Sequence, residues 1–212
     1  MTKHAPLVHI VDDDPAIRDA LSWLFATRQV NTERWECGEA FLNALGPETQ
    51  GCILLDIRMD GLSGLEVFEQ LRQRQSCLPV IFLTGHGDLP LAVTALKQGA
   101  ADFIEKPFND NDLVDRVLEV LRNYEASQKA RDHEQALEQR LDTLSQRERE
   151  VLALALEGRL NKQIAQDLNI TMRTVEVHRA RALEKMQART LIELARLLDP
   201  ARLREDRSPP GP

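Results

Sequence analysis

The sequence predicts an α/β domain followed by an all-α domain. Over the first 123 residues, short apolar runs alternate with segments of helical spacing. This alternation favours parallel strands joined by right-handed crossovers in a doubly wound sheet. A polar stretch without Gly or Pro follows, and the rest of the chain carries four short helical patterns. A length of 212 residues leaves room for two domains of ordinary size.

Five segments are expected to form the sheet. Four of them are apolar or β-branched runs, whereas the segment 31–35 is more polar and is expected at an edge. The expected strands are residues 7–11, 31–35, 52–56, 79–84 and 102–105. The segments between them show helical spacing of apolar residues, for example Ile17, Leu21 and Leu24. We therefore expect residues 6–122 to form the first domain.

The remaining residues are expected to be helical up to a polar tail. Residues 123–141 form an exposed linker helix, a semi-rigid spacer whose few leucines make only a weak case for a coiled coil. Residues 142–200 form a four-helix domain, in which Ser145 and Glu148 make a capping box for a helix that ends near Gly158. Further helices are expected at residues 161–168, 172–186 and 190–198. Residues 201–212 are expected to be disordered.

Composition argues against several classes of protein. No apolar stretch approaches the roughly 20 residues that span a bilayer, and the first residues do not resemble a signal peptide, so a cytoplasmic location is expected. The three cysteines show no CxxC spacing and are expected to be small buried hydrophobic residues. The five histidines show no ligand spacing, which argues against a zinc site.

The charge is distributed unevenly. The formal net charge is −7, but residues 1–123 hold 11 Lys and Arg against 19 Asp and Glu, which gives −8. Residues 171–189 hold five basic and two acidic residues, which gives +3. A local excess of positive charge on a helix is typical of a surface that faces nucleic acid.

Charged residues follow the ends of the predicted strands. The carboxyl ends of parallel strands meet at one edge of a sheet, where ligands bind. Asp12 and Asp13, Asp56, Thr84 and Lys106 stand at four such ends. An acidic run before a proline is also a helix-cap signal, and taken alone it does not separate that interpretation from a metal site.

Carboxylates at this edge suit a hard divalent cation such as Mg²⁺ or Mn²⁺. Asp12, Asp13 and Asp56 would supply carboxylate oxygens, and the backbone carbonyl of Arg58 would complete the set. Without a cation, three neighbouring carboxylates should raise at least one pKa.

Four segments together resemble the receiver domain of two-component response regulators, which has a flavodoxin-like sheet. They are "VDDD", "LLDIRMDGLSG", "FLTGHGD" and "DFIEKPF", and the resemblance covers about the first 120 residues. It implies that Asp56 accepts a phosphoryl group from a sensor histidine kinase and that Lys106 contacts the phosphoryl oxygens. Thr84 would close on the phosphate, and Phe103 would turn inward. The family usually has proline where this chain has Asp60.

Other interpretations of these residues stay open at this point. Lys106 could be a surface lysine, Thr84 a strand end and Phe103 a core residue. The chain could also carry a vestigial receiver and bind DNA without phosphorylation. A phosphatase with an Asp nucleophile after its first strand is a further alternative, but the chain has no room for a substrate cap.

The helix expected at 172–186 has two different sides. Val175, Ala182, Leu183 and Met186 share one side, with Arg179 at its edge. The opposite side mixes arginines with small and apolar residues, which suits a DNA major groove. For Lys185 we expect only pairing within the charged helix surface, with Arg181 or Glu184.

Residues 144–186 resemble the LuxR-type helix-turn-helix, and the whole chain resembles the FixJ-like branch of the NarL/FixJ response regulators. The resemblance implies phosphate contacts from Lys162, Arg173 and Thr174. It implies contacts to bases from Glu176, Val177, Ala180 and Arg181.

The same resemblance implies a regulator of transcription rather than an enzyme, acting on promoter DNA and RNA polymerase, with activation the expected direction. A homodimer is expected after phosphorylation, through a receiver face that contains Val93 and Lys97, because a shift of Thr84 would alter the adjoining helix surface.

Overall fold

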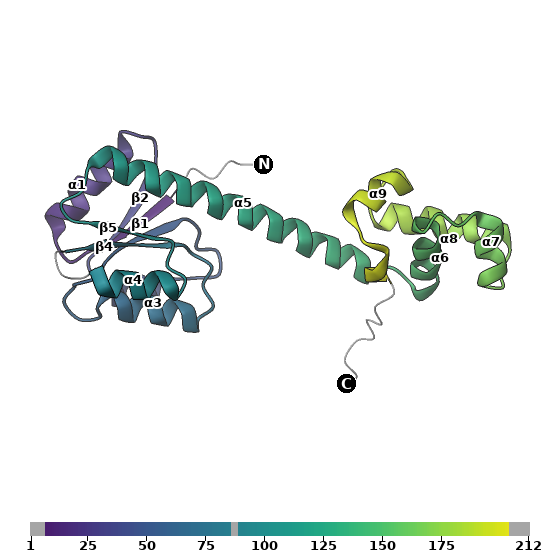
Figure 1. The fold of residues 1–212 in the computed structure, drawn as a ribbon, viewed down its shortest axis with the longest axis horizontal. Coiled ribbons are helices and arrows are strands. Elements are labelled where there is room, and N and C mark those ends of the chain that lie inside the picture. Colours follow the sequence, from purple (N-terminus) through teal and green to yellow (C-terminus); the bar gives the residue numbers. More distant parts are fainter. Residues whose placement is uncertain (1–6, 86–88, 204–212) are drawn as a thin grey trace. The chain divides into compact units, whose positions relative to one another are not determined.

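The computed structural model describes residues 7–85 and 89–203 and divides the chain into two compact units after Gln128. The first unit is a five-stranded sheet between two layers of helices, and the second unit is helical (Figure 1). The predicted fold class, α/β followed by all-α, is confirmed.

The strands lie where the apolar runs predict them. They are β1 (Leu7–Val11), β2 (Asn31–Trp35), β3 (Cys52–Asp56), β4 (Val80–Thr84) and β5 (Asp102–Glu105). All neighbours pair in parallel, in the order β2-β1-β3-β4-β5. The polar strand β2 is an edge strand, as predicted. Strand β4 begins at Val80 and not at the predicted Pro79, because proline has no N–H to donate to a ladder.

Helices cover both faces of the sheet. The helix α1 (Pro15–Ala26) and the first part of α5 (Asp110–Asp142) pack on one face (Figure 1). The helices α2 (Gly38–Ala44), α3 (Gly64–Gln73) and α4 (Leu89–Lys97) pack on the other. Because both faces are covered, β3 and β4 are buried along their whole length, which explains their continuous apolar sequences.

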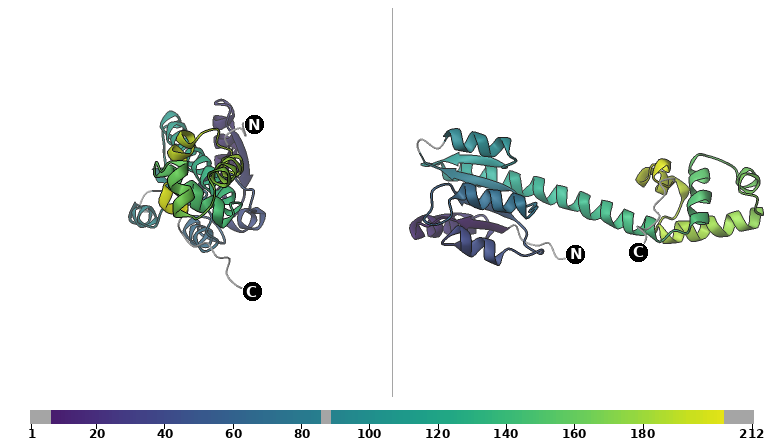
Figure 2. Two further views of the ribbon diagram at one scale, coloured as in Figure 1. Left: turned by 90° about the vertical axis from the view of Figure 1, so that its right-hand side faces the viewer. Right: turned by 90° about the horizontal axis from the view of Figure 1, so that it is seen from below.

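The predicted linker belongs to a single long helix. Helix α5 runs without interruption from Asp110 to Asp142, so residues 123–141 continue the last helix of the first unit (Figure 2). Leu137 and Leu141 are buried in the core of the second unit. The expectation of an exposed spacer is therefore wrong for this end of the helix, where two leucines one turn apart pack against the helical domain.

The second unit contains α6 (Gln146–Leu156), α7 (Asn161–Asp167), α8 (Met172–Lys185), α9 (Leu191–Leu197) and a short 3₁₀ helix, η1 (Pro200–Leu203). The predicted capping box is present, because Ser145 and Glu148 each accept a hydrogen bond from the other's backbone N–H. Gly158 has φ +84° just after α6, a conformation that favours glycine at a helix end.

The predicted start of the disordered tail, at residue 201, is wrong by at least three residues. Residues 201–203 lie in η1, where Leu203 is buried and Arg202 pairs with Glu134 and Glu138 of α5. A single leucine within a polar sequence carries too little pattern to predict this packing. Residues 204–212 lie outside the described residues.

The prediction that the three cysteines are buried is correct for only one of them. Cys52 is buried, but Cys37 is half-buried and Cys77 is exposed, so the expectation of three buried cysteines is wrong for two of them. Cys77 lies exposed in the loop between α3 and β4.

Within residues 7–85 and 89–203, no helix is long and apolar enough to cross a membrane.

Lys185 joins the last turn of α8 to the start of α6. Its ammonium donates to Glu148 Oε2 at 2.6 Å and to the carbonyl of Thr143 at 3.0 Å. Burial raises the pKa of Glu148, but hydrogen bonds from Lys185 and Ser145 outweigh burial and leave the pKa below its usual value. The expectation that Lys185 pairs within its own helix is therefore wrong.

A buried arginine fixes the junction between α5 and α6. Arg149 is only 8% exposed, and its guanidinium donates to the carbonyls of Leu141 at 2.6 Å and Leu144 at 3.4 Å. Leu141 lies in the last turn of α5, whereas Leu144 follows the helix, and the N–H of Leu144 also donates to the Leu141 carbonyl at 3.1 Å. Arg149 therefore adds donors to the backbone at the junction of α5 and α6.

Replacing Arg149 by Met is expected to lower the free energy of unfolding of the second unit by about 1–3 kcal/mol, because buried carbonyls lose their donors. Both tryptophans, Trp23 and Trp35, lie in the first unit, so fluorescence would not report on this change. Amide hydrogen exchange in α6 and α8 measures it. Arg147→Met is the matched control, since Arg147 is exposed and pairs only at the surface with Glu150. Equal protection of the two variants would contradict this role.

Candidate functional site

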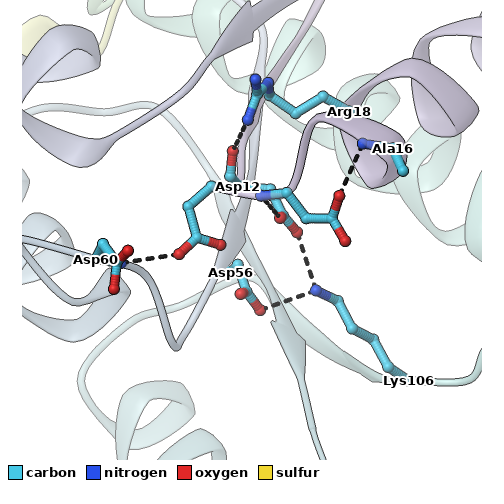
Figure 3. A network of polar contacts seen from close by, with 8 residues as sticks. Asp12, Ala16, Arg18, Asp56, Asp60 and Lys106 are labelled. Carbon is cyan, nitrogen blue, oxygen red and sulfur yellow. Dashed lines mark hydrogen bonds and ion pairs between the residues drawn. The ribbon is translucent and has the colours of Figure 1, made fainter.

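The residues predicted from the strand ends lie together in the structure. Asp12 and Asp13 follow β1, Asp56 ends β3, Thr84 ends β4 and Lys106 follows β5. One carboxylate oxygen from each of Asp12, Asp13 and Asp56 lies within 4.8 Å of the other two. Figure 3 shows the side chains of Asp12, Asp56 and Lys106 pointing toward one another. The carboxyl edge of the sheet is therefore an acidic site with one ammonium group.

The three consecutive aspartates do different things. Asp12 is fully buried, and its Oδ1 accepts from the backbone N–H of Asp14 at 2.9 Å. Asp13 is exposed and takes part in the acidic cluster. Asp14 caps α1, since its carboxylate accepts from the N–H of Ala16 at 2.8 Å and Pro15 opens the helix. The helix-cap interpretation is therefore correct for Asp14, and Asp12 and Asp13 remain available to the acidic cluster.

Lys106 bridges two of the carboxylates. Its Nζ donates to Asp12 Oδ2 at 2.9 Å and to Asp56 Oδ1 at 3.1 Å. Burial lowers the pKa of Lys106, but the hydrogen bond and charge of Asp12, followed by those of Asp56, outweigh burial and raise the pKa above its usual value. The ammonium is therefore charged at neutral pH and offsets part of the carboxylate charge.

Asp56 is almost completely buried, at 8% exposure. Burial raises the pKa of its carboxyl, Lys106 lowers it, and the charges of Asp12 and Asp13 raise it again, which leaves the pKa above its usual value. The pKa of Asp56 is thus raised, as expected, but burial is the largest cause and the neighbouring carboxylates contribute less.

The backbone of Asp56 packs closely against the start of α3. Gly64 opens α3 beside the carbonyl of Asp56, and a Cβ at Gly64 would lie 2.1 Å from that oxygen. The N–H of Gly64 also donates to the carbonyl of Ile57 at 3.0 Å. Glycine is therefore required here by the close approach of the two segments. Arg58 follows in the same loop, with an exposed side chain.

Helix α8 has the two sides that the sequence predicts. Val175, Ala182 and Met186 are buried, and Leu183 packs partly buried against the same core. Arg179 at the edge donates to Asn161 Oδ1 at 3.2 Å, which ties α8 to α7.

The residues predicted to face DNA lie on the outer side of this pair of helices. Arg173, Glu176, Val177, Ala180 and Arg181 are exposed on α8, and Lys162 is exposed on α7. Thr174 is half-buried, and its hydroxyl lies 2.8 Å from that of the N-cap residue Thr171. An arginine-rich face with an exposed valine and alanine has the composition of a surface that enters a major groove.

Comparison with known proteins covers both units. Residues 8–118 match the response regulator receiver domain, and residues 142–198 match the luxR family of bacterial regulatory proteins. The chain is 50% identical over 192 residues to the C4-dicarboxylate transport transcriptional regulatory protein DctR of Rhodobacter capsulatus, covering 90% of this chain and 98% of that protein. The chain belongs to the NarL/FixJ family of response regulators.

Further relatives of this response regulator support the same assignment. It is 41% identical over 190 residues to the transcriptional regulatory protein FixJ of Bradyrhizobium diazoefficiens, covering 90% of this chain and 93% of that protein. The solved structure of the response regulator StyR covers 92% of this chain at 39% identity with a TM-score of 0.85, and 98% of StyR is matched. Full-length FixJ from B. japonicum covers 96% of this chain at 40% identity with a TM-score of 0.59, and 99% of it is matched.

The family gives the two units their general functions. Receiver domains bind Mg²⁺ through acidic residues, which matches the Asp cluster of this response regulator. A receiver joined to a DNA-binding domain implies a kinase partner and DNA. Relatives with this arrangement are regulators of transcription.

The two residues predicted to switch the receiver lie on neighbouring strands. Thr84 is buried at the end of β4, and its carbonyl accepts from the N–H of Lys106 at 2.7 Å. Phe103 on β5 pairs in register with Phe82 and packs partly buried against the core under α2, α3 and α4. Contact with the core agrees with the interpretation of Phe103 as a core residue, and its role as a switch stays a prediction.

The predicted dimer face lies on α4 of the receiver. Val93 is 40% exposed and Lys97 is exposed, and Leu91 of the same helix is 43% exposed. Val93 and Lys97 are four residues apart and share one side of α4, which therefore has both apolar and charged character, whereas Leu91 lies on a different side.

Sequence reasoning missed two contacts to the aspartates of this receiver. Arg18 on the first turns of α1 donates to the carbonyl of Asp12 at 2.7 Å. The backbone N–H of Asp60 donates to Asp13 Oδ2 at 2.9 Å. Figure 3 shows both contacts at the edge of the acidic site. Neither contact has a periodic signal in the sequence, because each involves a backbone group. The acceptor is the carbonyl of Asp12 in the first contact, and the donor is the N–H of Asp60 in the second.

Proposed function

We propose that a sensor histidine kinase phosphorylates this chain on Asp56 and that the phosphorylated chain dimerises and activates transcription in the cytoplasm. The observation that carries the proposal is the position of the Asp56 carboxylate. It is nearly buried, it contacts the Lys106 ammonium, and it lies beside Asp12 and Asp13 at the carboxyl edge of the sheet. The chain would act as a regulator rather than as an enzyme with turnover.

The donor set fits Mg²⁺ or Mn²⁺. Three carboxylate oxygens lie within 4.8 Å of one another. Asp13 is exposed, which leaves room for water and phosphate oxygens on its side of the site. These cations prefer oxygen ligands of this kind. Asp12, Asp13, Asp56 and the carbonyl of Arg58 would hold the cation. When bound, it would neutralise charge on the phosphoryl oxygens.

The transfer step needs positioning and charge more than covalent chemistry. One carboxylate oxygen of Asp56 forms a bond to phosphorus while the bond from phosphorus to the histidine nitrogen of the kinase breaks. The Lys106 ammonium, already 3.1 Å from Asp56, offsets the charge of the three phosphoryl oxygens. The new oxygens would then accept from the Thr84 hydroxyl, and Phe103 would turn inward behind it.

The second unit would deliver this signal to promoter DNA and RNA polymerase. Lys162, Arg173 and Thr174 would contact phosphates, and Glu176, Val177, Ala180 and Arg181 would face the bases. Dimerisation would bring two such units to paired half-sites, which raises their effective concentration on DNA.

Phosphorylation is expected to convert the chain from monomer to dimer through the α4 surface. Sedimentation of the full chain with and without beryllofluoride and Mg²⁺ measures this change as a doubling of mass. Val93→Asp and Lys97→Glu should each weaken the dimer by about tenfold, since buried or reversed charge at an interface costs on the order of 1.4 kcal/mol or more.

Trp23→Asp is the matched control for this experiment. Trp23 is 74% exposed on α1, which packs on the opposite face of the sheet from α4. This variant should dimerise like the wild type. Identical masses with and without beryllofluoride at every concentration would refute dimerisation, and equal weakening by Trp23→Asp would refute the α4 surface.

A further inference from the structure

Two carboxylates hold the loop that follows Asp56. This β3–α3 loop, residues 57–63, donates the N–H of Asp60 to Asp13 Oδ2 at 2.9 Å and the N–H of Leu62 to Glu39 Oε1 at 3.0 Å. Figure 3 shows Asp60 at the side of the acidic site, with the dashed line running to the neighbouring carboxylate. The loop is therefore tied both to the metal-binding edge and to α2.

The remaining parts of the loop have little freedom. Gly61 lies between the two donors with φ +80°, and a Cβ there would lie 2.7 Å from Glu39 Oε1. The backbone of Ser63 starts α3 through a capping box with Glu66. Because both ends of the loop are fixed, the N–H of Asp60 is well placed to hold the Asp13 carboxylate.

We propose that Asp60 is a positioning residue of the metal site, whose backbone N–H holds the Asp13 carboxylate toward Asp12 and Asp56 and so raises the affinity for a divalent cation. The inference rests on the proposed function, since it concerns the same site. It assigns the effect to the backbone of Asp60 and not to its carboxylate.

The charges of the site show what a donor at this position contributes. Asp13 is exposed, whereas Asp12 and Asp56 are buried and already contact Lys106. Repulsion from the other two carboxylates favours rotation of the exposed Asp13 side chain away from them. A hydrogen bond from an amide to a carboxylate is about twice as strong as one between neutral groups, and it opposes this rotation.

The residue type at position 60 decides whether this contact exists. Proline has no N–H, so the residue that the family usually carries here cannot make the contact. The φ angle of Asp60 is not positive, so the sign of φ at this position is compatible with proline. In this chain the N–H at position 60 therefore adds a contact to Asp13 that a proline at this position cannot make.

Two substitutions separate the backbone from the side chain. Asp60→Ala keeps the N–H and removes the carboxylate, whereas Asp60→Pro removes both. Isothermal titration of the metal-free full chain with MgCl₂ gives the dissociation constant directly, without any phosphorylation assay. Asp60→Ala should stay within about twofold of the wild type. Asp60→Pro should bind Mg²⁺ about three- to tenfold more weakly than Asp60→Ala, the loss of one charge-assisted hydrogen bond near the surface.

A second measurement does not depend on how the proline variant folds. In the metal-free wild type, the Asp60 amide should exchange its hydrogen slowly, and Asp13→Ala should remove this protection while the amide of Leu62 stays protected by Glu39. Equal Mg²⁺ affinity of Asp60→Pro and Asp60→Ala, tighter binding by Asp60→Pro, or an unprotected Asp60 amide would each overturn the inference. Absence of Mg²⁺ binding by the wild type would instead overturn the metal site of the proposed function.

Discussion

Replacing Glu176 by Ala is expected to change which base pair is preferred at one position of the DNA site. Glu176 is exposed near the start of α8, and its carboxylate can accept from the N4 amino group of cytosine. The same carboxylate repels phosphates, so it should select a sequence without strengthening binding in general. The variant should lose roughly 1–3 kcal/mol on the preferred duplex and little on random DNA.

Lys162→Ala should fail in a different way. Lys162 is exposed on α7 and is proposed to contact a phosphate, which carries no sequence information. Its loss should weaken binding to preferred and random duplexes alike and should lower the slope of log affinity against log salt by about 1.

A competition series at several salt concentrations separates the two effects, using a preferred duplex selected from a random pool by the wild type. Glu184→Ala is the matched control for Glu176→Ala, because it removes the same charge from an exposed position at the other end of α8. It should leave the base preference unchanged. If Glu176→Ala and Glu184→Ala show the same preference as the wild type, α8 does not present Glu176 to the bases.

The sheet was predictable chiefly because its strands β3 and β4 are buried on both faces. Residues 52–56 and 79–84 are continuous apolar runs, and their observed burial shows why no polar residue interrupts them. The position of the acidic site followed from the same pattern. Parallel strands end at one edge, so residues far apart in sequence, such as Asp12, Asp56 and Lys106, had to meet there.

Backbone contacts outside the local capping patterns were not predictable. The hydrogen bond between Asp60 and Asp13 depends on the path of a loop, which has no period and whose donor is independent of the side chain. The burial of Arg149 has no signal in the sequence, because the carbonyls that it contacts, those of Leu141 and Leu144, lie in the preceding helix end and loop. The burial of Leu137 and Leu141 was likewise unexpected, since two leucines in a long polar helix also fit an exposed spacer.

The division of the three aspartates was only partly predictable. The residue before Pro15 had to be a good helix cap, and Asp14 takes this position. The acidic run taken alone did not separate a helix cap from a metal site, whereas its position at a strand end favoured Asp12 and Asp13 for the site. The structure separates them because Asp12 continues β1 into the sheet edge while Asp14 already belongs to α1.

Asp56→Asn is expected to abolish phosphorylation of the chain. Asn replaces the anionic carboxylate, whose oxygen forms the bond to phosphorus, by a neutral amide, while the size of the side chain and its place beside Lys106 are retained. Asp19→Asn is the matched control, because Asp19 is exposed on α1 and pairs only with Arg34 at the surface. This control should be phosphorylated like the wild type.

The most direct test of phosphorylation at Asp56 is the mass of the chain after incubation with acetyl phosphate and Mg²⁺, with the modified residue located by peptide mapping. One phosphoryl group is expected on Asp56 in the wild type and in Asp19→Asn, and none in Asp56→Asn or with excess chelator. A wild type that gains no phosphoryl group would favour a vestigial receiver. A phosphoryl group on Asp12 with continuous release of phosphate, or equal labelling of Asp56→Asn, would contradict the account.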